Sequence, residues 1–256
     1  MCLILFSYNQ HPDNRLVMAA NRDEFFARPT APAAFWEEAP GVLSGRDLQG
    51  GGSWFGITRC GRLAAVTNFR DRGELQEGGT SRGLLVSDYL LGEEPPGDYL
   101  RRVARRGAEY KGFNLLAGDG EGLWYYSNRQ GRVRRLPPGL YGLSNHLLDT
   151  PWPKVAGGKV ALAAALDGTP DPEALFALLA DTTRVADAEL PDTGFGPEWE
   201  RILSSRFIAG PDYGTRSSSV LLVGREGRVE FTERSYAKNH GSWREERFTF
   251  QIACND

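Results

Sequence analysis

A cysteine directly follows the initiator methionine, at the start of the apolar run CLILFSY (residues 2–8). If Met1 is removed, Cys2 becomes the amino terminus and carries a thiol and an α-amine on one residue. The ordinary pKa of an α-amine is about 7.7 to 8.0, so part of it is neutral near pH 7 and can accept the thiol proton. Cys2 is therefore a candidate N-terminal nucleophile. A retained Met1 would place this nitrogen in a peptide bond and remove the base.

Two charged residues in the run AANRDEF (residues 19–25) could assist such a nucleophile. The positive charge of Arg22 would favour the thiolate, and Asp23 would hold and orient the ammonium group. Because neighbouring residues of a strand point to opposite faces, both reach Cys2 only if the chain turns there. Taken alone, a cysteine that begins a buried strand is more often an apolar filler, and a run of Asn, Arg, Asp and Glu is more often a solvated turn.

The composition is that of an ordinary globular protein, with 256 residues, 41% hydrophobic and 25% charged. A net charge of −3 gives no reason to expect nucleic acid as a partner. The three cysteines, Cys2, Cys60 and Cys254, are odd in number and far apart, which argues against a disulfide framework and for a cytoplasmic location. No apolar run reaches the roughly 18 residues of a membrane span. The three histidines share no spacing typical of a metal site.

Short apolar runs joined by turn-forming residues predict antiparallel strand pairs. The runs at 2–8 and 15–20 flank NQHPDN, and the same pattern recurs around RCG, GDGEG, NRQG and GREG. SWREERFTFQIA (242–253) is typical of a final strand. Helices are predicted at 81–92, 97–110, 152–168 and 171–182, the last with Asp171 as N-cap and a proline behind it.

Runs of hairpins on both sides of a helical block predict an α+β fold, with antiparallel sheets and helices layered outside them. No long linker or repeat interrupts the chain, so we expect a single domain over residues 1–256. The stretch 183–200 is predicted to be a long irregular loop. The glycine-rich QGGGSW (49–54) precedes a strand rather than a helix, so we interpret it as a flexible loop and not as a phosphate cradle.

Several motifs follow one another in an order that resembles a known family. After the initial MC they are NRDEF, RPT, LSGRDL, GGSWFGI, GRLAAVTNFR, YKGFNLL, YGLSNHLLDTPWPK, YGTRSSSVLLV and FTERS. Over essentially its full length the chain resembles the NRDE family, also called the transport and Golgi organisation family. That family is grouped with the N-terminal nucleophile hydrolases and is similar to choloylglycine hydrolase and penicillin V acylase. The resemblance implies a four-layer αββα sandwich of two antiparallel sheets flanked by helices.

The resemblance also implies catalytic roles. In those acylases a cysteine exposed by methionine removal attacks the substrate, an aspartate at the end of the second strand holds the amine, asparagines stabilise the oxyanion, and a late arginine lies near the nucleophile. The matching residues are Cys2, Asp23, Asn68 in AVTNF, Asn145 in LSNH and Arg216 in GTRSSS. The relatives' first arginine usually precedes its aspartate by three positions, whereas Arg22 and Asp23 are adjacent, so Arg22 departs from the family's spacing. Without the resemblance, Asn68 and Asn145 are ordinary turn residues and Arg216 a surface or salt-bridged one.

These residues support two functions of different classes. The first is a cysteine-dependent amidohydrolase or acyltransferase that acts on a small amide or acyl substrate and requires no cofactor. The alternative, which depends on family analogy, is a non-catalytic carrier of haem or of an acyl-CoA or lipid-like ligand, with His146 as a ligand-binding residue and Cys2 or His146 as the haem ligand. A structural protein on an inherited hydrolase scaffold, with its cleft filled by side chains, is a third interpretation.

Overall fold

The computed structural model describes residues 2–71, 80–238 and 241–253. Within these residues the strands form two sheets in which neighbouring strands run antiparallel. Sheet A has the strand order β10-β1-β2-β11-β12-β13, and sheet B has the order β3-β4-β5-β6-β7-β8-β9.

The strand bounds follow the chain. Sheet A contains β1 (Cys2–Tyr8), β2 (Asn14–Phe25), β10 (Gly139–Leu143), β11 (Tyr213–Gly224), β12 (Arg228–Tyr236) and β13 (Trp243–Gln251). Sheet B contains β3 (Thr30–Trp36), β4 (Ala39–Asp47), β5 (Phe55–Thr58), β6 (Leu63–Asn68), β7 (Phe113–Gly118), β8 (Leu123–Ser127) and β9 (Arg134–Arg135).

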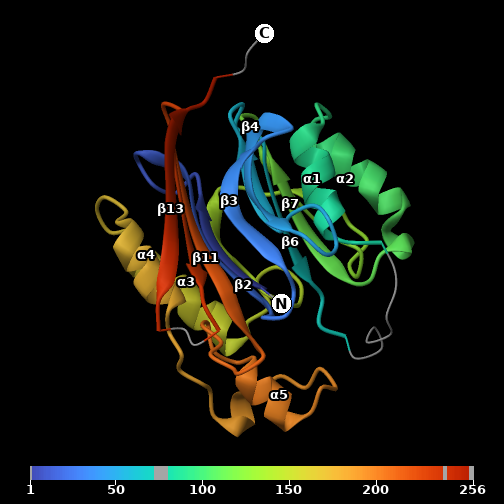
Figure 1. Ribbon diagram of the computed structural model, residues 1–256, viewed down its shortest axis with the longest axis vertical. Helices are drawn as coiled ribbons and strands as arrows, with labels where there is room; N and C mark the ends of the chain where they lie inside the picture. Colours follow the sequence, from blue (N-terminus) through green and yellow to red (C-terminus); the bar gives the residue numbers. More distant parts are fainter. Residues whose placement is uncertain (1, 72–79, 239–240, 254–256) are drawn as a thin grey trace.

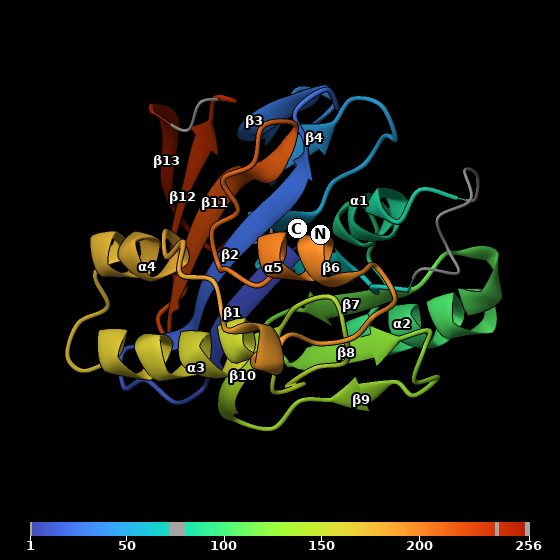
Figure 2. The same cartoon turned by 90° about the horizontal axis from the view of Figure 1, so that it is seen from below.

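Helices cover the outer face of each sheet, which gives the four-layer αββα sandwich that the resemblance implied (Figure 1). Helices α1 and α2 pack on sheet B, and α3 and α4 pack on sheet A. A fifth helix, α5, lies at one end of the sandwich (Figures 1 and 2). The helix bounds are α1 (Gly83–Leu91), α2 (Pro96–Arg105), α3 (Pro153–Ala165), α4 (Pro172–Leu179) and α5 (Pro197–Ile202).

The apolar run of β1 has two buried faces because sheet A is covered on both sides. Ile4 and Phe6 point into the core between the sheets, whereas Leu3 and Leu5 point into the core beneath α3 and α4. All four side chains are buried. This explains why the first strand is almost continuously hydrophobic instead of alternating.

The predicted hairpins are confirmed. β1 pairs with β2, β5 with β6, β7 with β8, β8 with β9, and β11 with β12, each across the turn residues that the sequence marked. The first four helices overlap the predicted ranges, and the Asp171 side chain accepts a hydrogen bond of 3.0 Å from the Glu173 amide, as an N-cap does. The predicted final strand is β13.

Three regions differ from the prediction. Strand β10 was not predicted, because two of its five residues are glycines, which weaken the β pattern. Strands β3 and β4 were not predicted, because the prolines and small polar residues of this stretch interrupt the β pattern. The stretch 183–200, predicted as irregular, contains a 3₁₀ turn at Asp187–Glu189 and the start of α5. These elements are too short to show a helical period.

No helix in the described residues is long and apolar enough to cross a membrane.

Candidate active site

The end of sheet A brings together the start of β1 and the end of β2. Cys2 is paired with Arg22, and on the other side of β2 the strand β11 pairs Thr215 with Asp23 and Ser217 with Arg22. The register shifts by one residue between Thr215 and Ser217, so Arg216 occupies a β-bulge. The hairpin of β1 and β2 and the distant strand β11 therefore bring Cys2, Asp23 and Thr215 to one end of sheet A.

Cys2 lines a pocket of about 590 Å³, which we call the Cys2 pocket. Its walls come from the ends of β1, β2 and β6, from the loop before β5 and from the start of α1. The other lining residues are Arg22, Asp23, Glu24, Arg28, Asp47, Gln49, Gly50, Ser53, Trp54, Val66, Asn68, Thr80, Ser81, Arg82, Gly83 and Lys111. Four of the predicted catalytic residues, Cys2, Arg22, Asp23 and Asn68, thus share one pocket.

Several groups shift the pKa of the Cys2 thiol in opposite directions. Burial raises its pKa, and the carboxylate of Asp23 acts in the same direction. The charge of Arg22 and a hydrogen bond from the backbone N–H of Asp23 favour the thiolate instead. Since burial dominates, the thiol requires a base in order to become a good nucleophile.

Arg22 and Asp23 point to opposite faces of sheet A, as the strand geometry predicts. The Arg22 guanidinium lies 4.2 Å from the Trp54 ring centroid, on the side between the sheets. Asp23 is buried toward the helices, where its Oδ1 accepts a hydrogen bond of 2.7 Å from the hydroxyl of Thr215. Burial raises the pKa of the Asp23 carboxyl. Both residues still act on Cys2, because Cys2 stands at the end of the strand, directly across from Arg22 and next to the position of Asp23.

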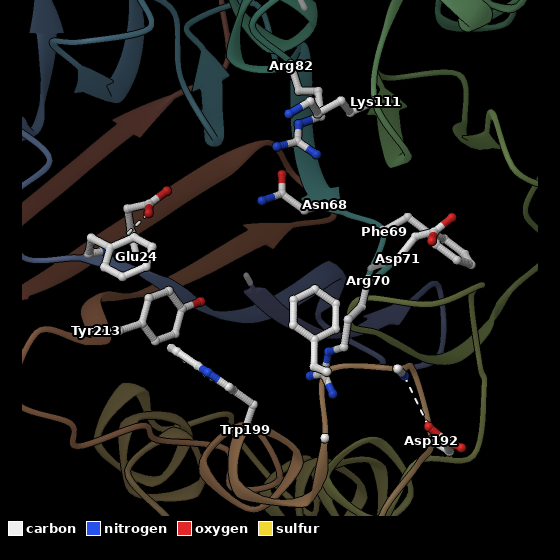
Figure 3. A pocket seen from close by; sticks show the side chains of 14 residues that line it. Glu24, Asn68, Phe69, Arg70, Asp71, Arg82, Lys111, Asp192, Trp199 and Tyr213 are labelled. Carbon is white, nitrogen blue, oxygen red and sulfur yellow. Dashed lines mark hydrogen bonds between the residues drawn. The ribbon is translucent and has the colours of Figure 1, made fainter. Parts of the chain in front are cut away.

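Asn68 is the last residue of β6 and projects into the cavity beside Arg82 and Lys111 (Figure 3). An amide N–H at this place is a suitable donor to the oxyanion of a carbonyl attacked by Cys2. Asn145, by contrast, is fully buried and lines neither the Cys2 pocket nor the larger pocket beside it, which is described below. Its Nδ2 donates to the Asn68 carbonyl at 3.0 Å, so Asn145 supports Asn68 from behind.

The remaining two predicted residues lie apart from Cys2. Nη1 of Arg216 donates to the carbonyls of Phe25 and Arg28 at 2.8 and 2.9 Å, so this side chain holds the turn that follows β2. His146 packs between Phe69 and Trp152, and its Nδ1 lies 2.8 Å from the Thr150 hydroxyl. Burial lowers the pKa of His146. Neither Arg216 nor His146 lines the Cys2 pocket.

A larger pocket of about 890 Å³ adjoins the Cys2 pocket. Five aromatic side chains give it apolar walls, and we call it the aromatic pocket; they are Phe25, Phe69, Phe195, Trp199 and Tyr213. Glu24, Asn68, Arg82 and Lys111 line both pockets, so the two pockets lie side by side and Asn68 belongs to their common border. Figure 3 shows Trp199 and Tyr213 on the wall opposite Arg82 and Lys111.

Behind Asp23 lies a buried charged cluster that sequence reasoning missed: Arg70, Lys154 and Glu200. Arg70 and Glu200 form an ion pair at 2.6 Å, and Nζ of Lys154 donates to the Leu203 carbonyl at 3.0 Å. Burial lowers the pKa of Lys154 to about 8, and the charge of Arg70 adds to this effect. The three residues come from segments far apart in the chain, and no local spacing links them.

The glycine-rich loop was also missed as part of the site. Gln49, Gly50 and Ser53 line the Cys2 pocket. The loop packs closely on the start of α1, because the Ser53 amide donates to the Gly83 carbonyl and Gly52 has a φ of +72°. A Cβ atom on Gly52 would clash with the Gly83 oxygen. Only glycine fits this contact, and the packing gives the loop a defined path along the pocket.

Comparison with known proteins identifies the family. The profile described as Transport and Golgi organisation 2 matches residues 1–238. The Transport and Golgi organization protein 2 homolog of Bos taurus is 42% identical over 257 residues, covering 92% of this chain and 93% of that one. The homolog of Homo sapiens is 37% identical over 275 residues, covering 98% and 99%. Among solved structures, the C2A mutant of conjugated bile acid hydrolase from Clostridium perfringens aligns with a TM-score of 0.41 and 11% identity, covering 98% of this chain and 92% of that one. The chain belongs to the Transport and Golgi organisation 2 family.

Proposed function

We propose that this protein is a cysteine-dependent hydrolase or acyltransferase that uses Cys2 as an N-terminal nucleophile on a small amide or acyl substrate. The observation that carries the proposal is the shared lining of one pocket by Cys2, Arg22, Asp23 and Asn68. A nucleophile, an acid that faces its amine and an amide donor are the groups that acyl transfer requires.

The reaction begins once Met1 has been removed. The α-amine of Cys2 takes the thiol proton, and the sulfur attacks the substrate carbonyl carbon, so that an S–C bond forms and the carbonyl electron pair moves to oxygen. The amide N–H of Asn68 stabilises this oxyanion. The intermediate collapses to a thioester, and the leaving group departs with the proton from the α-ammonium. Water then attacks the thioester, gives a proton back to the amine, and releases the acid and the thiol.

The aromatic pocket supports an acyl substrate. It meets the Cys2 pocket at Asn68, so a substrate whose carbonyl carbon lies at the Cys2 sulfur and whose oxygen faces Asn68 can extend its apolar chain toward Trp199 and Tyr213. Burial of each methylene in such a pocket contributes about 0.8 kcal/mol. The acylation rate should therefore rise with acyl length.

The test uses 4-nitrophenyl acetate, butyrate and octanoate, with release of nitrophenolate and the mass of the N-terminal peptide as readouts. We expect a burst of one equivalent, an acyl group on Cys2, and faster acylation by octanoate than by acetate. C2A abolishes both signals, and C60S, which removes another thiol, keeps them. Equal turnover by C2A and the wild type contradicts the proposal, and intact mass establishes whether Met1 is absent.

The aromatic pocket also favours a second candidate function, a non-catalytic carrier of an acyl-CoA or lipid-like ligand. Equilibrium binding of a fluorescent fatty acid separates the two, since a carrier binds it without acyl transfer and equally well in C2A. The side chains do not fit haem ligation by His146, because this ring is packed between Phe69 and Trp152 and lines neither pocket. Haem titration of the wild type and H146A checks this point, and we expect the same absorbance spectrum for both.

A further inference from the structure

Lys154 is a buried cation directly beneath the Cys2 end of sheet A. It stands in the first turn of α3, which packs on β1, and the residue is 6% exposed. Among the described residues, the hydrogen-bonding partner of its Nζ is the Leu203 carbonyl. An ammonium group whose hydrogen-bonding partner is a neutral carbonyl costs much to bury, so its retention requires an explanation.

The charged groups around Lys154 come from four different elements. Asp23 lies on β2, Cys2 on β1, Arg70 after β6, and Glu200 on α5. Arg70 and Glu200 form a 2.6 Å ion pair, and the charge of Arg70 still acts on Lys154. The charge of Lys154 in turn acts on Asp23 and on Cys2 at the start of β1.

The α-amine of a freed Cys2 faces two opposing charges. The carboxylate of Asp23 favours the ammonium form, which cannot act as a base. A cation beside it disfavours a second positive charge and therefore favours the neutral amine. Arg22 and Tyr213 also interact with Cys2, and Arg22 lies on the other face of the sheet, stacked on Trp54. Further charged residues line the Cys2 pocket among the described residues: Glu24, Arg28, Asp47, Arg82 and Lys111.

We propose that Lys154 is a positioning residue for the reaction. Its positive charge keeps the freed α-amine of Cys2 neutral and basic, whereas the carboxylate of Asp23 favours the protonated form. The inference depends on the proposed function and adds a residue to it. Because burial lowers the pKa of Lys154 to about 8, its charge is present at neutral pH and disappears as the pH rises above 8. The effect of Lys154 on the amine is therefore strongest below pH 8.

The experiment measures the rate of Cys2 acylation by 4-nitrophenyl acetate from pH 5.5 to 9.0, in full-length protein whose intact mass confirms the loss of Met1. The variants are K154M and K154Q, which remove the charge, and K154R, which keeps it. K154Q retains an N–H donor for the Leu203 carbonyl. K159M is the matched control, since Lys159 stands on the same helix but pairs with Asp149 at the surface.

Below the pKa of the α-amine the acylation rate falls with pH, which gives the profile an acid limb. In K154M and K154Q we expect the midpoint of this limb to shift to a pH about one unit higher, so that acylation at pH 6.5 falls about tenfold. The rates converge with the wild type above pH 8.5. K154R and K159M should keep the wild-type limb. A role in packing alone would slow the neutral variants equally at every pH.

An unshifted limb in the neutral variants, or an equal slowing at all pH values, overturns the role of Lys154 while the proposed function stands. The wild type provides a test without any variant: an acid limb at or above pH 8, where an ordinary α-amine titrates, also overturns it. If the processed wild type is not acylated at any pH, both this inference and the proposed function fail.

Discussion

The two asparagines of the site have different positions although the sequence presents them alike. Asn68 lines both pockets at the end of β6, whereas Asn145 is fully buried and donates to the Asn68 carbonyl. The backbone carbonyl of Asn145 in turn accepts a hydrogen bond of 2.7 Å from the backbone N–H of Arg70. Asn145 therefore fixes the path of the chain around residues 68–70.

We expect N68A to lower the acylation rate about 10²–10³-fold with little change in stability, because it removes an oxyanion donor from an open pocket. N145A should instead lower the free energy of unfolding by about 1–3 kcal/mol, because it leaves buried polar groups without partners. Ester kinetics and urea unfolding of both variants provide the measurements. Equal losses of stability in the two would contradict the division of roles.

Among the elements, the loop between β4 and β5 and the start of α1 form one wall of the Cys2 pocket. Their contact is backbone on backbone, at Gly52 and Gly83. A glycine-rich sequence indicates only that another part of the chain can come close to its backbone. In this fold that part is the start of α1 at Gly83, which lies well beyond the loop in the sequence.

G52A tests this contact. Its Cβ would clash with the Gly83 oxygen, and its φ of +72° is unfavourable for alanine, so we expect a loss of stability greater than the roughly 1–2 kcal/mol of backbone strain alone. G131A is the matched control, because Gly131 has a φ of +71° and a Cβ there would meet nothing within 4 Å. Thermal unfolding compares the two, and equal losses would show that the close contact contributes nothing.

At the scale of the whole molecule, the buried ion pair Arg70–Glu200 joins the chain after β6 of sheet B to α5, which borders the aromatic pocket. Glu200 also accepts a hydrogen bond of 3.2 Å from the Thr193 amide. One carboxylate thus ties the segment 193–200 to the residues that follow Asn68. The aromatic pocket exists because this segment is held against the sandwich.

E200Q should destabilise the protein by about 3–5 kcal/mol, since it leaves the Arg70 charge buried without its partner. It should also increase proteolytic cleavage within 183–196. D187N, which breaks the exposed Arg201–Asp187 pair of the same region, is the control and should change neither property much. Urea unfolding and limited proteolysis measure both effects, and an E200Q protein as stable as D187N would contradict the assignment.

The sequence by itself determined much of the fold. Apolar runs of strand length and turn residues are local signals, so the hairpins and the first four helices could be read from it, and the order of motifs indicated the layers. The sequence also singled out Cys2, because a thiol and an α-amine on one residue can be recognised without knowing which residues surround it.

Only the tertiary structure decided which residues surround Cys2. Arg70, Lys154 and Glu200 meet behind Asp23 from segments with no common spacing, and the glycine loop reaches the pocket by packing on α1. The fold also buries Asn145 as a support for Asn68, whereas Asn68 itself lines the pocket. Local patterns specify strands and turns, whereas burial and charge pairing depend on contacts between residues far apart in the chain.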